Sequence, residues 1–207
     1  MYFNTFLYSW YKRKKIHNGG FLIYLVRHGL DDEKYIGGYS NVALTKEGIS
    51  QVERLAKFLK NNNYKFEKIV SSDILRARQT SEIIARELGL EIEFNPLLRE
   101  LNKGKLNGML KEKANTEFPL FMKGITIETK YPDGESMIEF YERIKDSLER
   151  ILKLDNKLLV THRGVINMLY YLLNDISVDM NKERFGVEHA TLHELDPKIK
   201  IIKKVGI

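Results

Sequence analysis

The hydrophobic positions along this chain alternate between short continuous runs and longer stretches with helical spacing. Apolar runs occur at residues 21–27, 66–71 and 157–161, and runs of this length are typical of strands buried within a sheet. Between them, apolar residues recur three and four positions apart, which predicts helices. These helices are expected over residues 45–59, 74–88, 136–152 and 165–173.

Capping residues mark the ends of the predicted helices. Thr45 is the expected N-cap of the first helix, Ser136 begins the third, and Gly89 ends the second. The buried face of the first helix is predicted to contain Ile49, Val52, Leu55, Ala56 and Leu59. The buried face of the third is predicted to contain Ile138, Tyr141, Ile144, Leu148, Ile151 and Leu152.

The remaining segments are less regular. Residues 92–98 are expected to be extended around Pro96, and residues 190–204 are expected to form a terminal hairpin or strand pair. Residues 105–135 indicate an insertion or lid, with a short helix near residues 111–118. Because strands and helices alternate elsewhere, the predicted fold is α/β, a three-layer sandwich whose mostly parallel, twisted sheet has helices on both faces.

Charge is distributed unevenly along the chain. One domain is expected over residues 21–207, preceded by an extension over residues 1–20 that holds four basic residues and no acidic one. The other 187 residues carry 30 basic and 28 acidic side chains, so the domain is nearly neutral although the formal net charge is +6. A nucleic-acid binder would have a basic body, so no nucleic-acid partner is expected.

The extension is predicted to be mobile and joined to the domain through Asn18-Gly19-Gly20. Its apolar residues precede its positive charges, the reverse of a secretory signal, and are too few to cross a bilayer. Contact of this aromatic and basic segment with a membrane surface is the alternative. No stable membrane insertion is expected, since no run of 18 apolar residues occurs. The absence of cysteine excludes disulfides and thiolate metal sites, and it fits a cytoplasmic location.

Polar groups gather where the predicted parallel strands end. Arg27-His28 ends the first strand, and Arg76 lies in the first turn of the helix that follows the second. Leu98-Arg99-Glu100 and Thr161-His162 follow later extended segments. Each residue alone has an ordinary structural interpretation. Because parallel strands end at one sheet edge, where α/β proteins bind ligands, we expect these groups to share a pocket.

The order of these motifs resembles that of the histidine phosphatase superfamily, the phosphoglycerate-mutase-like group. The resemblance runs from about residue 21 to about residue 195. The similar segments are Arg27-His28-Gly29, residues 37–48, residues 71–80, Leu98-Arg99-Glu100 with Gly104 and Gly108, residues 132–136, and Thr161-His162. The motifs are specific in combination because they occur in the family's order.

The resemblance implies a role for each group. His28 would be the nucleophile that becomes phosphohistidine, and Glu100 would give a proton to the leaving group. Arg27, Arg76 and His162 would hold the phosphoryl oxygens. Phosphoryl transfer needs positioning and charge neutralisation, which these groups supply without a metal or cofactor. The attacking nitrogen of His28 must be unprotonated, so its other ring nitrogen should donate to a fixed carbonyl or carboxylate.

Some positions depart from the family's pattern. Leu30 stands where relatives commonly have Glu or Gln, and residues 31–33 form a short acidic stretch. Residues 104–108 lack an aromatic-acid pair that relatives often have, and Arg163 follows His162 where glycine is more frequent. These departures leave the phosphoryl chemistry intact and leave the identity of the substrate open.

The resemblance implies a metal-independent phosphomonoesterase that hydrolyses a small phosphorylated substrate through phosphohistidine. A phosphoglycerate mutase-type transfer by the same intermediate is the alternative, although the short chain and the segment after Glu100 favour hydrolysis. A non-catalytic phospho-ligand-binding protein is the third interpretation. It predicts that at least one of the five groups is lost, and all five are present. The sequence leaves the oligomeric state open.

Overall fold

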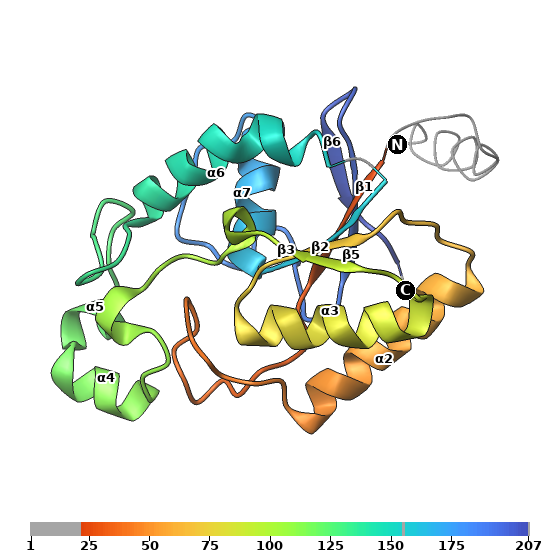
Figure 1. The fold of residues 1–207 in the computed structure, drawn as a ribbon. Coiled ribbons are helices and arrows are strands. Elements are labelled where there is room, and N and C mark those ends of the chain that lie inside the picture. The colour runs from red at the N-terminus through yellow and green to blue at the C-terminus, as the bar shows by residue number, and fades with distance from the viewer. Residues whose placement is uncertain (1–21, 155, 207) are drawn as a thin grey trace, which may run out of the picture.

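The computed structural model describes residues 22–154 and 156–206 (Figure 1). Within these residues, six strands form one sheet in the order β3-β2-β4-β1-β5-β6. The strands are β1 (Ile23–Arg27), β2 (Ile69–Ser71), β3 (Ile92–Phe94), β4 (Leu158–Thr161), β5 (Leu192–Asp196) and β6 (Ile201–Lys204). The expected extension over residues 1–20 lies outside the described residues.

The helices alternate with these strands along most of the chain. They are α2 (Lys46–Asn61), α3 (Leu75–Leu88), α4 (Lys111–Glu117), α5 (Pro119–Lys123), α6 (Met137–Ile151) and α7 (Arg163–Leu173). Two short 3₁₀ turns, η1 (Pro96–Leu98) and η2 (Gly104–Leu106), lie between β3 and α4. Among the described residues, no helix combines the length and apolar composition needed to cross a membrane.

The sheet is parallel through its first four positions and antiparallel at one end. Strands β3, β2, β4 and β1 run parallel to one another, whereas β5 is antiparallel to both β1 and β6. The antiparallel β5–β6 pair confirms the predicted terminal hairpin. The carboxyl ends of β1, β2 and β4 therefore meet at one sheet edge, which the start of β5 also reaches.

Helices cover both faces of the sheet, which confirms the predicted three layers (Figure 1). Side chains of α6 and α7 pack with Ile23 and Leu25 of β1 in one buried cluster. Side chains of α2 and α3 pack with Val26 in a second cluster. This division follows from the strand geometry, because successive side chains of a strand point to opposite faces.

The predicted caps are present, but two predicted core positions are wrong. Thr45 Oγ1 accepts from Gly48 N at 3.0 Å, Ser136 forms a capping box with Glu139, and Gly89 ends α3 with a positive φ of 69°. Ile49 is 38 % exposed because Gly48, rather than Ile49, packs against the chain after β1.

Ile138 in α6 is also wrong as a core position, because it is 36 % exposed. The buried stripe of α6 contains Phe140, Ile144 and Ile151, and Phe140 is only 1 % exposed. Two positions along a helix correspond to a rotation of about 200°, so Ile138 points away from the face that Phe140 occupies.

Several boundaries also differ from the prediction. Strand β3 ends at Phe94, and Pro96 begins a 3₁₀ turn in which Asn95 Oδ1 accepts from Leu97 N at 3.0 Å. Helix α7 begins at Arg163, two residues before the predicted start. Helix α5 was not predicted because five residues are too few to show helical periodicity.

The segment between η2 and α6 forms a small layer of its own, at one side of the molecule (Figure 1). It contains α4, as predicted near residues 111–118, and α5. Its buried cluster consists of Ile36, Leu106 and Ala114, with partly buried aromatic and methionine side chains around them. The segment therefore packs against the loop after β1 rather than inside the sheet layers.

Candidate active site

The five predicted site residues lie together at the carboxyl edge of the sheet. Arg27, His28, Arg76 and Glu100 line one cavity of about 350 Å³. The ring of His162 lies beside that of His28, with 5.2 Å between their centroids. The predicted convergence of two histidines, two arginines and one acid is therefore present in the structure.

Strand register explains why two histidines distant in sequence are neighbours. Arg27 pairs with Thr161 in the parallel β1–β4 ladder, and His28 N donates to Thr161 O at 3.0 Å. Each histidine is thus the first residue after its strand. Thr161 Oγ1 donates to Leu98 O at 2.8 Å, which ties the segment before Glu100 to the same edge.

The hydrogen bonds of His28 fix its protonation state. Its Nδ1 lies 2.7 Å from Gly29 O, and its Nε2 lies 3.0 Å from Nε of Arg76. A carbonyl oxygen only accepts and an arginine Nε–H only donates, so Nδ1 carries the hydrogen and Nε2 presents a lone pair. This is the arrangement expected of an attacking imidazole.

Charge and burial keep the His28 ring neutral. Burial lowers its pKa well below the usual value, and the positive charge of Arg76 lowers it further. The neighbouring His162 and Arg27 act in the same direction. The lone pair on Nε2 is therefore available at neutral pH.

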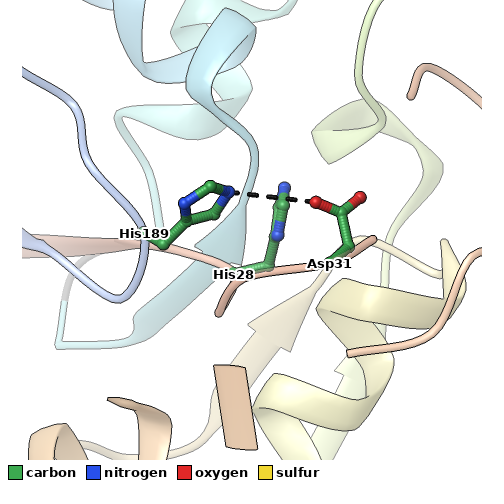
Figure 2. A group of neighbouring side chains, drawn as sticks. All are labelled: His28, Asp31 and His189. Carbon is green, nitrogen blue, oxygen red and sulfur yellow. Dashed lines mark ion pairs between the residues drawn. The ribbon is translucent and has the colours of Figure 1, made fainter. Parts of the chain in front are cut away.

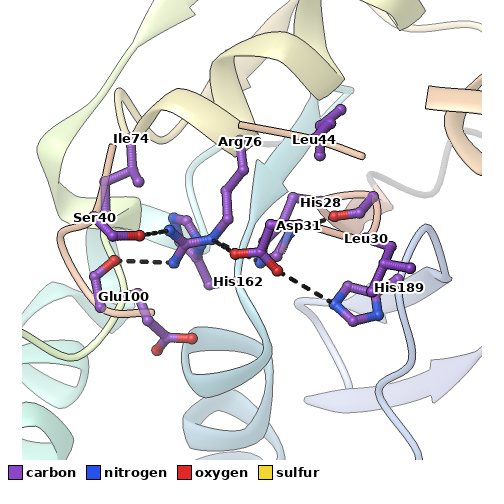
Figure 3. A network of polar contacts seen from close by, with 12 residues as sticks. His28, Leu30, Asp31, Ser40, Leu44, Ile74, Arg76, Glu100, His162 and His189 are labelled. Carbon is purple, nitrogen blue, oxygen red and sulfur yellow. Dashed lines mark hydrogen bonds and ion pairs between the residues drawn. The ribbon is translucent and has the colours of Figure 1, made fainter. Parts of the chain in front are cut away.

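Arg76 is held by a ring of acceptors (Figure 3). The residue is 2 % exposed, its Nη1 donates to Ser40 Oγ at 3.0 Å, and its Nη2 donates to Gly38 O at 2.9 Å. Asp31 Oδ2 lies 3.5 Å from its Nε. These contacts orient the guanidinium plane beside His28 Nε2, where it can neutralise an anion.

Two buried polar atoms beside His28 have no partner among the described residues. His162 is fully buried, and its Nε2 lies 2.8 Å from Ser72 Oγ, while its Nδ1 is unpaired. Arg27 donates through Nη1 to Val187 O at 2.7 Å, while its buried Nε is unpaired. Unpaired buried polar groups are costly. An anion with several oxygens could accept from donors at these positions.

Glu100 is fixed by backbone donors. Leu101 N donates to its Oε1 at 2.9 Å, and Gly164 N donates to its Oε2 at 3.1 Å. Gly164 lies in the first turn of α7, directly after His162 and Arg163. A Cβ atom at Gly164 would overlap Glu100 Oε1. The position of the carboxyl group therefore depends on the glycine opposite it.

Asp31 and His189 also reach the site, and neither was among the predicted site residues (Figure 2). Asp31 Oδ1 lies 3.8 Å from His189 Nε2, and both residues lie close to the ring of His28. Burial raises the pKa of Asp31, and Arg76 opposes this shift. Burial and the charge of Arg27 lower the pKa of His189 to about 3.

His28, Asp31 and His189 offer three potential metal ligands within 4.8 Å of one another. However, Arg76 donates to His28 Nε2, and Nη2 of Arg27 contacts His189 Nε2. A metal ion here would lie between two guanidinium groups, which repel cations. The charge distribution at this position therefore fits an anion better than a metal ion.

The position of His189 follows from the antiparallel strand β5. Ala190 N donates to His28 O at 3.1 Å, and Arg27 N donates to Thr191 O at 3.3 Å. Residues just before β5 therefore lie beside residues at the end of β1. The hairpin over residues 190–204 was predicted, but its pairing with β1 was not. A prediction of that pairing would have placed His189 beside His28.

Comparisons with known proteins agree with this geometry. The sequence profile of the histidine phosphatase superfamily (branch 1) matches residues 23–200. A protein of Escherichia fergusonii named "Probable phosphoglycerate mutase GpmB" is 38 % identical over 151 residues, which cover 68 % of each chain. A protein of the same name from Yersinia pestis is 32 % identical over 183 residues, 84 % of each chain.

Solved structures share the fold at lower identity. The α-ribazole phosphatase of Shigella flexneri has a TM-score of 0.74 at 21 % identity, over 90 % of this chain and 95 % of that chain. A mycobacterial glucosyl-3-phosphoglycerate phosphatase has a TM-score of 0.68 at 20 % identity, over 90 % and 96 %. Since the profile match spans most of the sequence, this chain belongs to the histidine phosphatase superfamily, branch 1.

Proposed function

We propose that this protein hydrolyses a small phosphate monoester through a phosphohistidine formed on His28 Nε2. The observation that carries the proposal is the hydrogen bonding of His28. Its Nδ1 donates to the carbonyl of Gly29, so the lone pair is on Nε2, where it faces the anion-binding guanidinium of Arg76. Membership of the superfamily supports this chemistry.

The proposed first step forms a nitrogen–phosphorus bond and breaks the ester bond. His28 Nε2 attacks phosphorus while Arg27, Arg76 and His162 contact the phosphoryl oxygens. Charge stabilisation of this kind is the main requirement of phosphoryl transfer. Glu100 gives a proton to the departing ester oxygen, which leaves as an alcohol.

The second step releases phosphate and restores the enzyme. The carboxylate of Glu100 takes a proton from a water molecule, whose oxygen attacks the phosphorus of phosphohistidine. The nitrogen–phosphorus bond breaks, and its electron pair returns to Nε2. Glu100 is then protonated again and His28 is free, so the cycle consumes one water molecule and one ester.

Mutase activity is the second candidate, because the sequence relatives are named as phosphoglycerate mutases while the structural neighbours are named as phosphatases. Incubating the enzyme with 3-phosphoglycerate and a chelator, and measuring free phosphate and the 2-phospho isomer together, separates them. We expect phosphate to be the main product. Isomer formation without phosphate release would favour the mutase. If no ester in a broad screen gave either product, both candidate activities would be contradicted.

Arg76→Lys is expected to weaken vanadate binding by at least about tenfold and to lower turnover by roughly 10²-fold or more. Lysine keeps the charge but cannot reproduce the three directed contacts to His28, Ser40 and Gly38. The control is Arg78→Lys, an exposed arginine two residues further along α3 that stacks on Phe94. Vanadate inhibition at steady state measures the effect. Equal affinity in Arg76→Lys and the wild type would place Arg76 outside the phosphoryl site.

Gly164→Ala is expected to slow alkyl phosphate hydrolysis by about tenfold or more, because the new methyl group displaces the carboxyl of Glu100. Aryl phosphates with good leaving groups need less proton donation and should be affected less. Gly37→Ala is the matched control, since Gly37 lines the same cavity and an added Cβ there would lie 3.9 Å from its nearest neighbour, Arg76 Nη2, which is ordinary van der Waals contact. Equal rate losses on both ester types would argue that Glu100 does not donate the proton.

A further inference from the structure

Asp31 places a negative charge of the protein among the groups proposed to bind the phosphoryl anion. Its Oδ2 lies 3.5 Å from Nε of Arg76, and its Oδ1 lies 3.8 Å from Nε2 of His189 (Figure 3). His189 in turn contacts Nη2 of Arg27. The carboxylate thus lies close to groups that would have to face a bound phosphate.

The position of Asp31 is set by the loop that follows β1. On one side of it, Leu30 O accepts from Thr45 N at 2.9 Å, and Asp31 itself forms a bridge with Leu44. A Cβ atom at Gly48 would overlap Leu30 O, because the start of α2 packs closely against this loop. These backbone contacts keep the side chain of Asp31 at the wall of the cavity, where it is 15 % exposed.

In the free enzyme, Asp31 is a counter-ion of the arginines. Burial lowers the pKa of Arg76, and the charge of Asp31 opposes this shift more strongly than that of Glu100. Burial raises the pKa of Asp31 itself, whereas Arg76 and Arg27 lower it. Opposite charges that share a buried site favour each other's ionised form. The protein therefore already offers Arg76 an anion.

Glu100, the proposed proton donor, is held differently from Asp31. Its two oxygens accept from the backbone N–H groups of Leu101 and Gly164. An oxygen of Asp31, in contrast, lies within 4.8 Å of a ring nitrogen of His28. A phosphoryl group bonded to His28 would lie beside this carboxylate, and like charges so close together in a partly buried site repel each other.

We propose that Asp31 is an internal competitor of the phosphoryl group, whose carboxylate neutralises Arg76 in the free enzyme and lowers the affinity of the site for phosphate. This inference rests on the proposed phosphoryl site, to which it adds a residue that promotes release of the product. A bound phosphate has to replace Asp31 as the partner of Arg76. Removing the charge of Asp31 should therefore tighten the binding of phosphate itself.

The test measures phosphate binding directly. The Kd of inorganic phosphate is measured by isothermal titration calorimetry at about pH 8, several units above the ordinary pKa of an aspartate. Asp31→Asn removes the charge and keeps the size of the side chain and an oxygen that can accept from Arg76. We expect its Kd to be lower than that of the wild type by about tenfold or more. Two charges about 5 Å apart at an effective dielectric constant of about 20 interact by more than a tenfold change requires.

A matched control separates this contact from a general effect of charge. Glu33→Gln also removes one negative charge from a residue that lines the cavity, two positions further along the same loop. Glu33 is exposed, so solvent screens its charge, and the Kd of this variant should stay within about twofold of the wild type. Asp31→Ala carries the same expectation as Asp31→Asn and replaces it if thermal unfolding shows that the asparagine variant is not folded.

The outcomes distinguish this inference from the proposed function. An unchanged or higher Kd in the folded Asp31 variant, or an equal decrease in Glu33→Gln, would overturn the inference. Hydrolysis of p-nitrophenyl phosphate by the same wild-type preparation reports on the proposed function separately, because the binding measurement needs no turnover. If neither the wild type nor the Asp31 variant binds phosphate, the phosphoryl site itself is contradicted, and the inference fails with it.

Discussion

Replacing His28 with alanine is expected to reduce turnover of every phosphate ester by about 10⁴-fold or more, the scale of loss seen when a covalent nucleophile is removed. No other imidazole of the described site has one ring nitrogen held by a backbone carbonyl acceptor while the other accepts from an arginine that lines the cavity. His162 uses Nε2 toward Ser72, and His189 uses Nε2 toward Arg27.

The His28→Ala experiment needs evidence that the protein still folds. Vanadate binding and thermal unfolding provide it, because Arg76 keeps its contacts to Ser40 and Gly38 when the imidazole is removed. His189→Ala is the matched comparison, since it removes a neighbouring ring that is not the proposed nucleophile. If His28→Ala retains substantial turnover, or if only His189→Ala abolishes it, His28 is not the nucleophile.

Glu100→Gln should lower kcat for alkyl phosphates by about 10²–10⁴-fold, the range typical of losing a general acid. An alkoxide is a poor leaving group and needs the proton, whereas p-nitrophenolate leaves readily without it. The loss on p-nitrophenyl phosphate should therefore be smaller by at least about tenfold. Steady-state kinetics on a series of esters with graded leaving-group pKa values measures this difference. We expect kcat to fall more steeply with increasing leaving-group pKa in the variant than in the wild type.

Glutamine also changes the hydrogen bonds of the site, so a second variant is needed for the acid role. The amide can accept from only one of Leu101 N and Gly164 N, both of which donate to the carboxyl. Gly164→Ala moves the same carboxyl without altering its chemistry. A leaving-group dependence unchanged in both variants would remove Glu100 from the acid role. Asp31, a partly buried acid beside His28, would then be tested next.

Much of the site could be predicted from the sequence because each predicted residue follows an element with a clear local signal. His28 and His162 follow apolar strands, and Arg76 lies in the first turn of a helix with regular spacing. Parallel strands bring such ends to one edge whatever their separation in the chain. The order of elements was therefore enough to predict their convergence.

The rest of the site depends on contacts without a local pattern. His189 lies beside His28 only because β5 pairs with β1, and Asp31 lies in a loop whose path is set by its packing on α2. Lys103 lines the cavity, although nothing in its sequence context distinguishes it from a surface lysine. Side-chain burial in loops of this kind is decided by tertiary packing rather than by local sequence.

The proposed chemistry is tested most directly by trapping the covalent intermediate. The enzyme is mixed with a ³²P-labelled ester, quenched within milliseconds and digested, and the labelled peptide is sequenced by mass spectrometry under alkaline conditions. The account predicts an acid-labile, alkali-stable phosphoryl group on the peptide that contains His28. Label on a serine, an aspartate or another histidine, or turnover without any covalent label, would contradict it.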